Sequence, residues 1–545
     1  MAYNSPMTDA GADLRFGIDR LVVSGRRLFG WGWAAHPERP VREVHLGVQG
    51  DGWRKRLAAQ SGILREDVLD QYPGFEGARF AGFVVTGYVP DPGIRGLALE
   101  ATFDDGSSAI FEIGTAVEVN ETARAQRYTP GRLWRALLRR LRSRDLGAFF
   151  RRSSNDDITL PSLDEREGQA KLRDALASAG NIRVVFDHDM GGGANQYRRE
   201  TIARSNAEGT ATVLCTFHLP TLEYRMHVVV PGGAGHELRA SSFVALEPLL
   251  QDSRLGELFV NSPVSFDQPA LFADWLTRMK ARRPALRLTL TTHDYFTVCP
   301  SFVLLNAEGR FCGIPEIAEC ERCLSRHAAP HVAFTPPTTM SAWREAWGRT
   351  LAAADEVRCF SEASRALLIR AYPAIERAAT TVVPHRVEFS PRRPRVSHAG
   401  TLVIGVLGKL NMQKGAQVVA DLARRIERDG VDARIVVIGS LEIAFRSPRL
   451  EVTGDYSRDD LPRLVERHGV NMFFFPSIWP ETFSYVISEM TALGLPIVAF
   501  DLGAPAERLR SNPRARLVER VDADAALDAL LELHRSLARN AAEAA

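Results

Sequence analysis

Residues 474–489 read FFPSIWPETFSYVISE and contain a strand, a loop and the start of a helix in succession. An apolar strand runs into a Pro/Ser loop, and a helix follows with Glu481 at its mouth and Glu489 about two turns later. Gly494 stops the helix, and the apolar run 497–500 is a returning strand. Helix amides attract phosphates, and carboxylates accept hydrogen bonds from hydroxyls. The pattern therefore favours a ligand that carries both groups, such as a nucleotide sugar.

Composition excludes several classes of protein. The chain has 545 residues, which is long enough for three or more globular domains. Its composition, 45% hydrophobic and 25% charged residues, is that of an ordinary globular protein. A formal net charge of +2 gives no global basic field for nucleic acid. No apolar run approaches the length of a bilayer span, and the start lacks the pattern of a secretory signal. Six cysteines do not indicate a disulfide scaffold, so we expect a cytoplasmic protein.

Residues 1–118 read as an all-β, β-sandwich-like accessory domain. Short strand-like runs are separated by turns, and Asp104-Asp105-Gly106 is a hairpin signal. The segment Gly30-Trp31-Gly32-Trp33 is compatible with core packing of the rings or with stacking on sugars. This part resembles the accessory β-domains of some bacterial polysaccharide-assembly enzymes.

Residues 119–178 are interpreted as a linker that contains one basic amphipathic helix. In 132–142, apolar residues recur at helical spacing and arginines fill the other face. Such a helix suits an anionic membrane surface, and it equally suits packing on a neighbouring domain with a solvated basic face.

From about residue 180 the pattern alternates between strands and helices in two successive arrays. We expect two doubly wound domains, at 179–395 and 396–522, with a cleft between them and a C-terminal helix at 523–545. The expected strands are 182–186, 211–214, 258–260 and 288–290 in the first array, and 401–408, 434–439, 472–475 and 497–500 in the second.

The turn 408–415 of the second array has a phosphate-binding arrangement. It follows a strand, precedes a helix near Ala416, and carries Lys409 and Lys414. The glycine spacing and Lys-Ser/Thr pair of a Walker loop are missing. Two lysines here would neutralise a diphosphate leaving group; alone, they would also read as surface residues beside a turn.

With these motifs in place, residues 401 to about 510 resemble the C-terminal domain of retaining GT-B glycosyltransferases of family four. The resemblance rests on Lys414-Gly415 and on two glutamates in the family's spacing, Glu481 and Glu489. It implies a GT-B fold, with two Rossmann-like domains. Lys409 stands where arginine is usual in the family.

The resemblance also implies roles for the donor site. Glu489 would bind the ribose hydroxyls, and Glu481 would contact the transferred sugar. Gly439 would lie near the nucleotide base, and the backbone amides of the helix mouth would face the phosphates, namely those of Thr482, Phe483 and Ser484. The family usually has glycine near position 484.

The first array supplies the acceptor side. Gly192 and Gly193 lie in a glycine turn that fits the family's first loop, although a tight strand–helix turn explains them as well. His293 ends a strand where ligands gather in open α/β sheets. It is interpreted as a catalytic partner of Glu481 that donates to a sugar hydroxyl or supports charge at the anomeric carbon, with a structural histidine as the alternative. Residues 384–387 depart from the family's Pro-Asn-Gly linker entry.

Four cysteines gather after His293. Cys320 and Cys323 have the spacing of a ligand pair, and two more thiols lie upstream; the spacing is less regular than that of a zinc ribbon but is compatible with a structural zinc site. Its ligands would be Cys299, Cys312, Cys320 and Cys323.

Taken together, the sequence predicts a peripheral glycosyltransferase on the cytoplasmic face of the inner membrane. It would move a hexosyl or deoxyhexosyl unit from a nucleoside diphosphate sugar to a surface-polysaccharide, O-antigen or lipid-linked glycan, with retention of configuration. No cofactor is expected for catalysis, and the partners are the donor, the glycan acceptor and an anionic membrane, not nucleic acid. The alternative is a catalytically degenerate GT-B protein that binds or scaffolds glycans.

Overall fold

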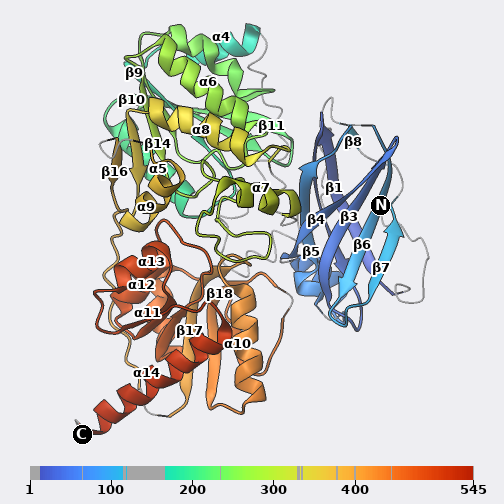
Figure 1. The fold of residues 1–545 in the computed structure, drawn as a ribbon, viewed down its shortest axis with the longest axis vertical. Coiled ribbons are helices and arrows are strands. Elements are labelled where there is room, and N and C mark those ends of the chain that lie inside the picture. The colour runs from blue at the N-terminus through green and yellow to red at the C-terminus, as the bar shows by residue number, and fades with distance from the viewer. Residues whose placement is uncertain are drawn as a thin grey trace.

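The computed structural model contains three folded bodies, a β-domain and two α/β domains. Figure 1 shows the two α/β domains stacked end to end and the β-domain beside them. The basic helix expected over 132–142 lies outside the described residues. The residues described are 13–63, 65–75, 77–91, 93–113, 118–119, 166–233, 235–327, 332, 335–375, 379–397, 400–443 and 445–543.

The first body is one sheet with the strand order β7-β6-β3-β4-β5-β2-β1-β8. Its neighbours pair antiparallel except β1 with β8, and the expected hairpin joins β6 to β7. The all-β character expected for the accessory domain is confirmed. Its elements are β1 (Arg15–Ser24), β2 (Arg27–Ala35), β3 (Val41–Gly50), β4 (Trp53–Ile63), α1 (Glu66–Gln71), η1 (Ala78–Phe80), β5 (Gly82–Tyr88), β6 (Ile94–Phe103), β7 (Ser108–Glu112) and β8 (Glu118–Val119).

The second body is a doubly wound domain around the order β12-β11-β10-β9-β13-β14-β15-β16. Six strands are parallel, and β11 and β12 add an antiparallel edge that the sequence reading missed. The elements are α4 (Arg166–Ala175), β9 (Asn181–Asp187), α5 (Gly193–Ala207), β10 (Thr210–His218), β11 (Glu223–Val229), β12 (His236–Ala240), η2 (Phe243–Gln251), β13 (Leu255–Val260), α6 (Pro269–Arg282), β14 (Arg287–Thr291), α7 (Ile317–Arg326), α8 (Met340–Ala353), β15 (Glu356–Cys359), α9 (Glu362–Ala371) and β16 (Thr380–Val382).

The third body is an all-parallel sheet in the order β19-β18-β17-β20-β21-β22. Its strands are buried on both faces, as near-continuous Val/Ile/Leu/Phe runs require. The elements are β17 (Leu402–Leu410), α10 (Ala416–Arg428), β18 (Ala433–Leu441), β19 (Leu450–Val452), η4 (Arg458–Asp460), α11 (Leu461–Arg467), β20 (Met472–Phe475), α12 (Tyr485–Leu493), β21 (Ile497–Phe500), α13 (Gly503–Leu509), β22 (Ala515–Val518) and α14 (Ala523–Glu543).

The β-domain packs directly on the second body. Val22 and Phe29 belong to the same buried cluster as Phe217 and Tyr224 of the Rossmann-like core. The Arg27 guanidinium lies 5.0 Å from the centre of the Phe217 ring. The β-domain also reaches the third body, because a Cβ on Gly62 would lie 2.7 Å from the carbonyl oxygen of Glu442.

Two stacked Rossmann-like domains preceded by an all-β domain confirm the expected GT-B architecture. Within the described parts of the chain, every helix is too short or too polar to cross a bilayer.

Candidate active site

The loop between β20 and α12 holds Glu481 in a buried position. Its side chain is 4% exposed and is hydrogen-bonded by Ser477 and Ser484. Burial raises the pKa of the Glu481 carboxyl, whereas the charge of Lys414 and the two hydroxyls oppose that rise. The loop therefore holds a buried carboxyl group within electrostatic range of the half-buried Lys414.

Gly415 packs the turn 408–415 against this loop. Its φ is 84°, and a Cβ would lie 2.0 Å from the carbonyl oxygen of Pro476. The amide of Ile478 donates to the carbonyl of Gln413 across 3.2 Å. Only glycine permits this approach, and the approach is what brings Lys414 beside Glu481.

Lys409 does not join Lys414. Its side chain is 74% exposed, and its Nζ lies 2.9 Å from Oε1 of Glu442. Gly439 lies on the neighbouring strand with a φ of 140°. A Cβ at this position would lie 2.0 Å from the carbonyl oxygen of Gly408, so only glycine fits. The two strand ends thus approach closely, while the Lys409 ammonium faces solvent.

Glu489 lies on α12, and its side chain is 5% exposed. Both of its carboxylate oxygens accept hydrogen bonds. The Tyr456 hydroxyl donates to Oε2 at 3.1 Å, and the Arg458 Nε donates to Oε1 at 2.9 Å. Burial, followed by the charge of Glu489, raises the pKa of Tyr456. Sequence reasoning missed both partners, although they follow strand β19 at the edge where ligands gather in parallel sheets.

The mouth of α12 carries a cation that the sequence reading also missed. Ser484 is the N-cap, and its Oγ accepts from the amide of Ile487. Arg508 of α13 donates to the Ser484 carbonyl and to Ser488 Oγ, each at 2.8 Å, and its guanidinium lies 4.7 Å from the centre of the Phe483 ring. Burial lowers the pKa of Arg508.

His293 faces this loop from the second body. Its Nε2 lies 2.9 Å from Oδ1 of Asn261, whose Nδ2 donates to the Ala194 carbonyl at 3.1 Å. That second bond orients the amide, so Nε2 of His293 carries the proton and donates it to Asn261. Burial holds the pKa of His293 well below its usual value. A neutral ring whose Nε2–H is already engaged presents Nδ1 as its remaining polar atom.

His385, at the unusual linker entry, contacts both α/β domains. Its ring centre lies 4.2 Å from that of Phe360 and 4.5 Å from that of Phe483. Its Nδ1 lies 2.9 Å from the Tyr485 hydroxyl. Burial, assisted by the charge of Arg508, lowers the pKa of His385 to about 3. The linker is therefore part of the site.

Further contacts join the two domains. Thr482 Oγ1 donates to the His293 carbonyl at 2.9 Å, and the Tyr295 hydroxyl donates to the Pro480 carbonyl at 2.8 Å. A Cβ on Gly193 would lie 3.1 Å from the ring of Tyr485, and Gly192, with φ 86°, is the N-cap of α5. The structure thus brings together the glycine turn, His293 and the loop of Glu481.

These buried histidines give the protein an acid-sensitive stability. Histidine in an unfolded chain has a pKa of about 6.5. Below that pH the unfolded chain binds protons at His293 and His385, whereas the folded protein leaves both rings neutral because their pKa values are lowered. The contribution of these two histidines to the free energy of unfolding is fully present above about pH 6.5 and is lost on acidification.

We expect the free energy of unfolding between pH 6 and pH 4 to fall less steeply in His385→Gln, by roughly 1.4 kcal/mol per pH unit. Denaturant unfolding at several pH values measures this, with exposed His236→Gln as control; equal slopes in both variants would contradict it.

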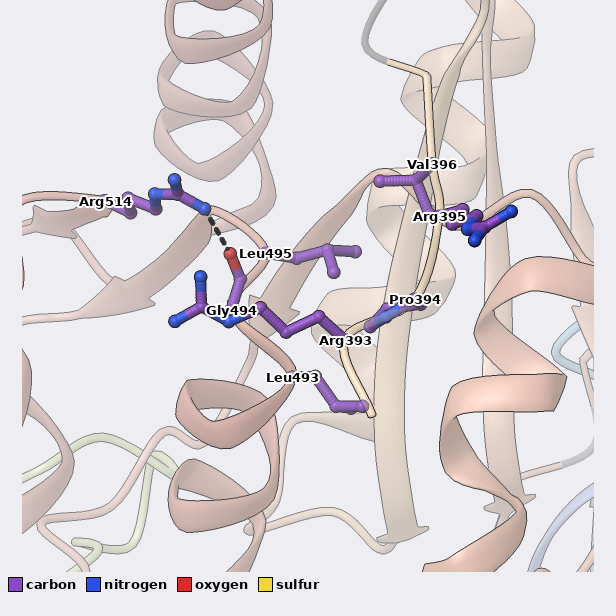
Figure 2. Close-up of a pocket in the computed structure, with 8 residues that line it drawn as sticks. All are labelled: Arg393, Pro394, Arg395, Val396, Leu493, Gly494, Leu495 and Arg514. Atoms are coloured by element: carbon purple, nitrogen blue, oxygen red, sulfur yellow. Dashed lines mark hydrogen bonds between the residues drawn. The ribbon is translucent and has the colours of Figure 1, made fainter. Parts of the chain in front are cut away.

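Two cavities lie near the linker between the α/β domains. One of about 390 Å³ is lined by linker residues, the end of α12 and Arg514, which donates to the Gly494 carbonyl at 2.7 Å (Figure 2). None of its lining residues is a predicted site residue. The other, of about 350 Å³, is lined by Phe389 and Asp459 among others, and the guanidinium of Arg458 lies 5.7 Å from the centre of the Phe389 ring.

The predicted zinc ligands remain free thiols. Cys299, Cys312, Cys320 and Cys323 form no disulfide. Among the residues that the structure describes, no group of three or more His, Cys, Asp or Glu side chains has the arrangement needed to hold a metal ion.

Comparison with known families identifies one match. Residues 401–536 match the family described as Glycosyl transferases group 1, and this range covers the third body from β17 into α14. No curated protein matches the chain.

Solved structures resemble the chain only distantly. Sucrose-phosphate synthase from Thermosynechococcus elongatus is 14% identical with a TM-score of 0.42, over 65% of this chain and 89% of that one. HepE of Anabaena in complex with UDP is 13% identical with a TM-score of 0.40, over 67% and 100%. The lipopolysaccharide outer core galactosyltransferase WaaB is 11% identical with a TM-score of 0.40, over 65% and 90%. At these scores the likenesses carry no functional argument.

Proposed function

We propose, on the premise that residues 401–536 are a domain of glycosyl transferases group 1, that the protein moves a hexosyl or deoxyhexosyl unit from a nucleoside diphosphate sugar to a glycan. One observation carries the proposal. Glu481 and Lys414 lie beside the N-terminal end of α12, Glu489 is buried in the middle of that helix, and His293 lies across the domain boundary, where its carbonyl accepts from Thr482. Carboxylates, a cation and free helix amides are the groups that such a donor needs.

The donor lies with its ribose at Glu489 and its diphosphate at the mouth of α12. Lys414 neutralises charge on the departing diphosphate, and the amides of residues 482–484 add oriented donors. Arg508 contributes positive charge beside Phe483. Lys409 acts from farther out, since it is exposed and paired with Glu442. Glu481, buried within the loop between β20 and α12, accepts hydrogen bonds from the sugar.

Transfer breaks the bond between the anomeric carbon and the diphosphate oxygen and forms a bond from that carbon to the acceptor oxygen. The acceptor proton passes to the departing phosphate oxygen, so the protein supplies no nucleophile and the configuration is retained. The protein positions the two reactants and stabilises charge. With its Nε2–H held by Asn261, neutral His293 keeps Nδ1 as a hydrogen-bond acceptor, so it can accept from a sugar hydroxyl but does not donate to one as the sequence led us to expect.

The acceptor is a surface polysaccharide, O-antigen or lipid-linked glycan on the cytoplasmic face of the inner membrane. This part of the proposal rests on the accessory β-domain and on the basic segment 132–142 of the sequence. Binding of the protein to vesicles with anionic lipids, compared with neutral vesicles, tests it; equal binding would remove the membrane from the proposal.

Glu489→Ala is expected to weaken donor binding at least 10-fold, because a ribose loses both acceptor oxygens of the buried carboxylate. A thermal-shift screen over nucleoside diphosphate sugars first identifies the donor that stabilises the wild-type protein. Titration of that donor into Glu489→Ala and Glu489→Gln then measures the loss. The exposed Glu532→Ala is the matched control, since its carboxylate pairs only at the surface with Arg516.

Donor affinity unchanged in both Glu489 variants would place the ribose elsewhere. A protein that is stabilised by no nucleotide sugar, and that neither transfers nor hydrolyses one, would instead support a glycan-binding or scaffolding role.

A further inference from the structure

Residues 299–326 form a small unit beside the active site that the proposed reaction does not use. It contains four of the six cysteines, whereas Cys215 and Cys359 lie buried in strands. The segment runs from a turn at Cys299 through a short hairpin, closed by the pair Leu305–Phe311, to helix α7.

The backbone of this unit is held in costly conformations. Among the described non-glycine residues, positive φ occurs at Leu222, Leu304 (55°) and Ile314 (58°), so two of the three lie here. Gly313, directly before Ile314, has φ 64°. Left-handed backbone at apolar, β-branched or bulky residues persists only where the surroundings fix it.

The turns point backbone amides at two of the sulfurs. The backbone at Ser301 hydrogen-bonds the Cys299 sulfur, and the backbone at Ile314 hydrogen-bonds the Cys312 sulfur. An amide two residues beyond a cysteine that donates to its sulfur stabilises a thiolate in the way that metal ligands require.

The other two sulfurs come from one face of a helix. Cys320 and Cys323 are three residues apart on α7 and therefore project from the same side. Cys312 lies centrally among the thiols, within electrostatic range of Cys299, Cys320 and Cys323. Positive charge from Arg344 also reaches Cys299, Cys312 and Cys320.

Helix α7 has little else to fix it. None of its ten residues is buried, and Ile317 is 41% exposed. A helix of this length is marginal by itself in water. Its main polar anchor is Glu321, whose carboxylate accepts from the amides of Met340 and Ser341 at the start of α8. A cross-link between α7 and the hairpin would supply the missing stabilisation.

We propose that Cys299, Cys312, Cys320 and Cys323 bind one zinc ion, which ties the hairpin to α7. Four thiolates are a ligand set that zinc prefers in structural sites. In the structure no three of these sulfurs converge on one point. Binding draws them together as four thiol protons leave to solvent and four Zn–S bonds form, with Arg344 offsetting part of the resulting negative charge.

The test is metal analysis of the full chain, purified without chelator and then dialysed after incubation with zinc chloride. We expect about one zinc per chain in the wild-type protein. The double variant Cys320→Ser/Cys323→Ser is expected to lose it, whereas Cys359→Ser, a buried cysteine outside the unit, retains it. Cys323→His is expected to keep the ion, because imidazole is also a zinc ligand.

A wild-type protein without zinc after this treatment overturns the proposal, as does full zinc content in the double variant. An intact mass lower by the hydrogens lost in disulfide formation would show that the thiols pair instead. Metal content is independent of sugar transfer, so failure of this proposal and failure of the proposed function are distinguishable.

Discussion

Lys414→Met is expected to lower kcat by about 10²–10³-fold while the protein stays folded. The ammonium lies within electrostatic range of the buried Glu481 and follows the turn that Gly415 fastens to the loop of Glu481. It is therefore held where charge develops on the leaving diphosphate, and methionine keeps most of its volume without the charge. Initial rates at saturating donor and acceptor measure kcat, and thermal unfolding without ligand confirms the fold.

Lys409→Met is the matched comparison, since it removes the same charge from the same turn. Its ammonium is exposed and paired with Glu442, so water screens it, and we expect a loss of no more than about 10-fold. Equal losses in the two variants would show that Lys409 turns inward when the donor binds. Near-wild-type turnover in Lys414→Met would refute the assignment of the diphosphate to this turn.

Gly415→Ala is expected to destabilise the protein by about 3 kcal/mol or more and to abolish transfer. The added Cβ would overlap the carbonyl oxygen of Pro476 at 2.0 Å, and φ 84° is unfavourable for alanine. Either the third body unfolds more readily or residues 476–484 move, and the second outcome displaces Glu481. Chemical denaturation and donor titration separate these effects.

Gly430→Ala provides the control for backbone strain alone. Its φ of 61° is equally left-handed, but no atom lies within 4 Å of an added Cβ. We expect a cost of about 1–2 kcal/mol and unchanged transfer. If both variants lose the same stability and Gly415→Ala still transfers sugar, the contact with Pro476 has no role in holding the site.

The fold was accessible from sequence because its signals are local. Apolar runs such as 472–475 mark buried parallel strands, and Gly494 marks the end of α12, without reference to distant residues. The antiparallel edge of β11 and β12 was missed. In β11, for example, buried and half-buried residues alternate in Glu223–Val229, a weaker pattern than a continuous apolar run.

The site was only partly accessible, because several of its contacts join segments far apart in the chain. Glu481 and Glu489 share one short motif, but Arg458, Arg508 and Asn261 reach the site from separate elements. No spacing rule connects them. The outward direction of Lys409 depends on Glu442 of the neighbouring strand end, which only the tertiary structure reveals.

The packing of the β-domain has a consequence for where this chain can be cut. Val22 and Phe29 complete the hydrophobic core around Phe217 and Tyr224, so the boundary near residue 118 separates two architectures but not two autonomous folding units. Truncation there would leave an apolar face of the catalytic half bare to solvent and prone to self-association. An accessory module that completes the core of the domain beside it is, in thermodynamic terms, part of that domain.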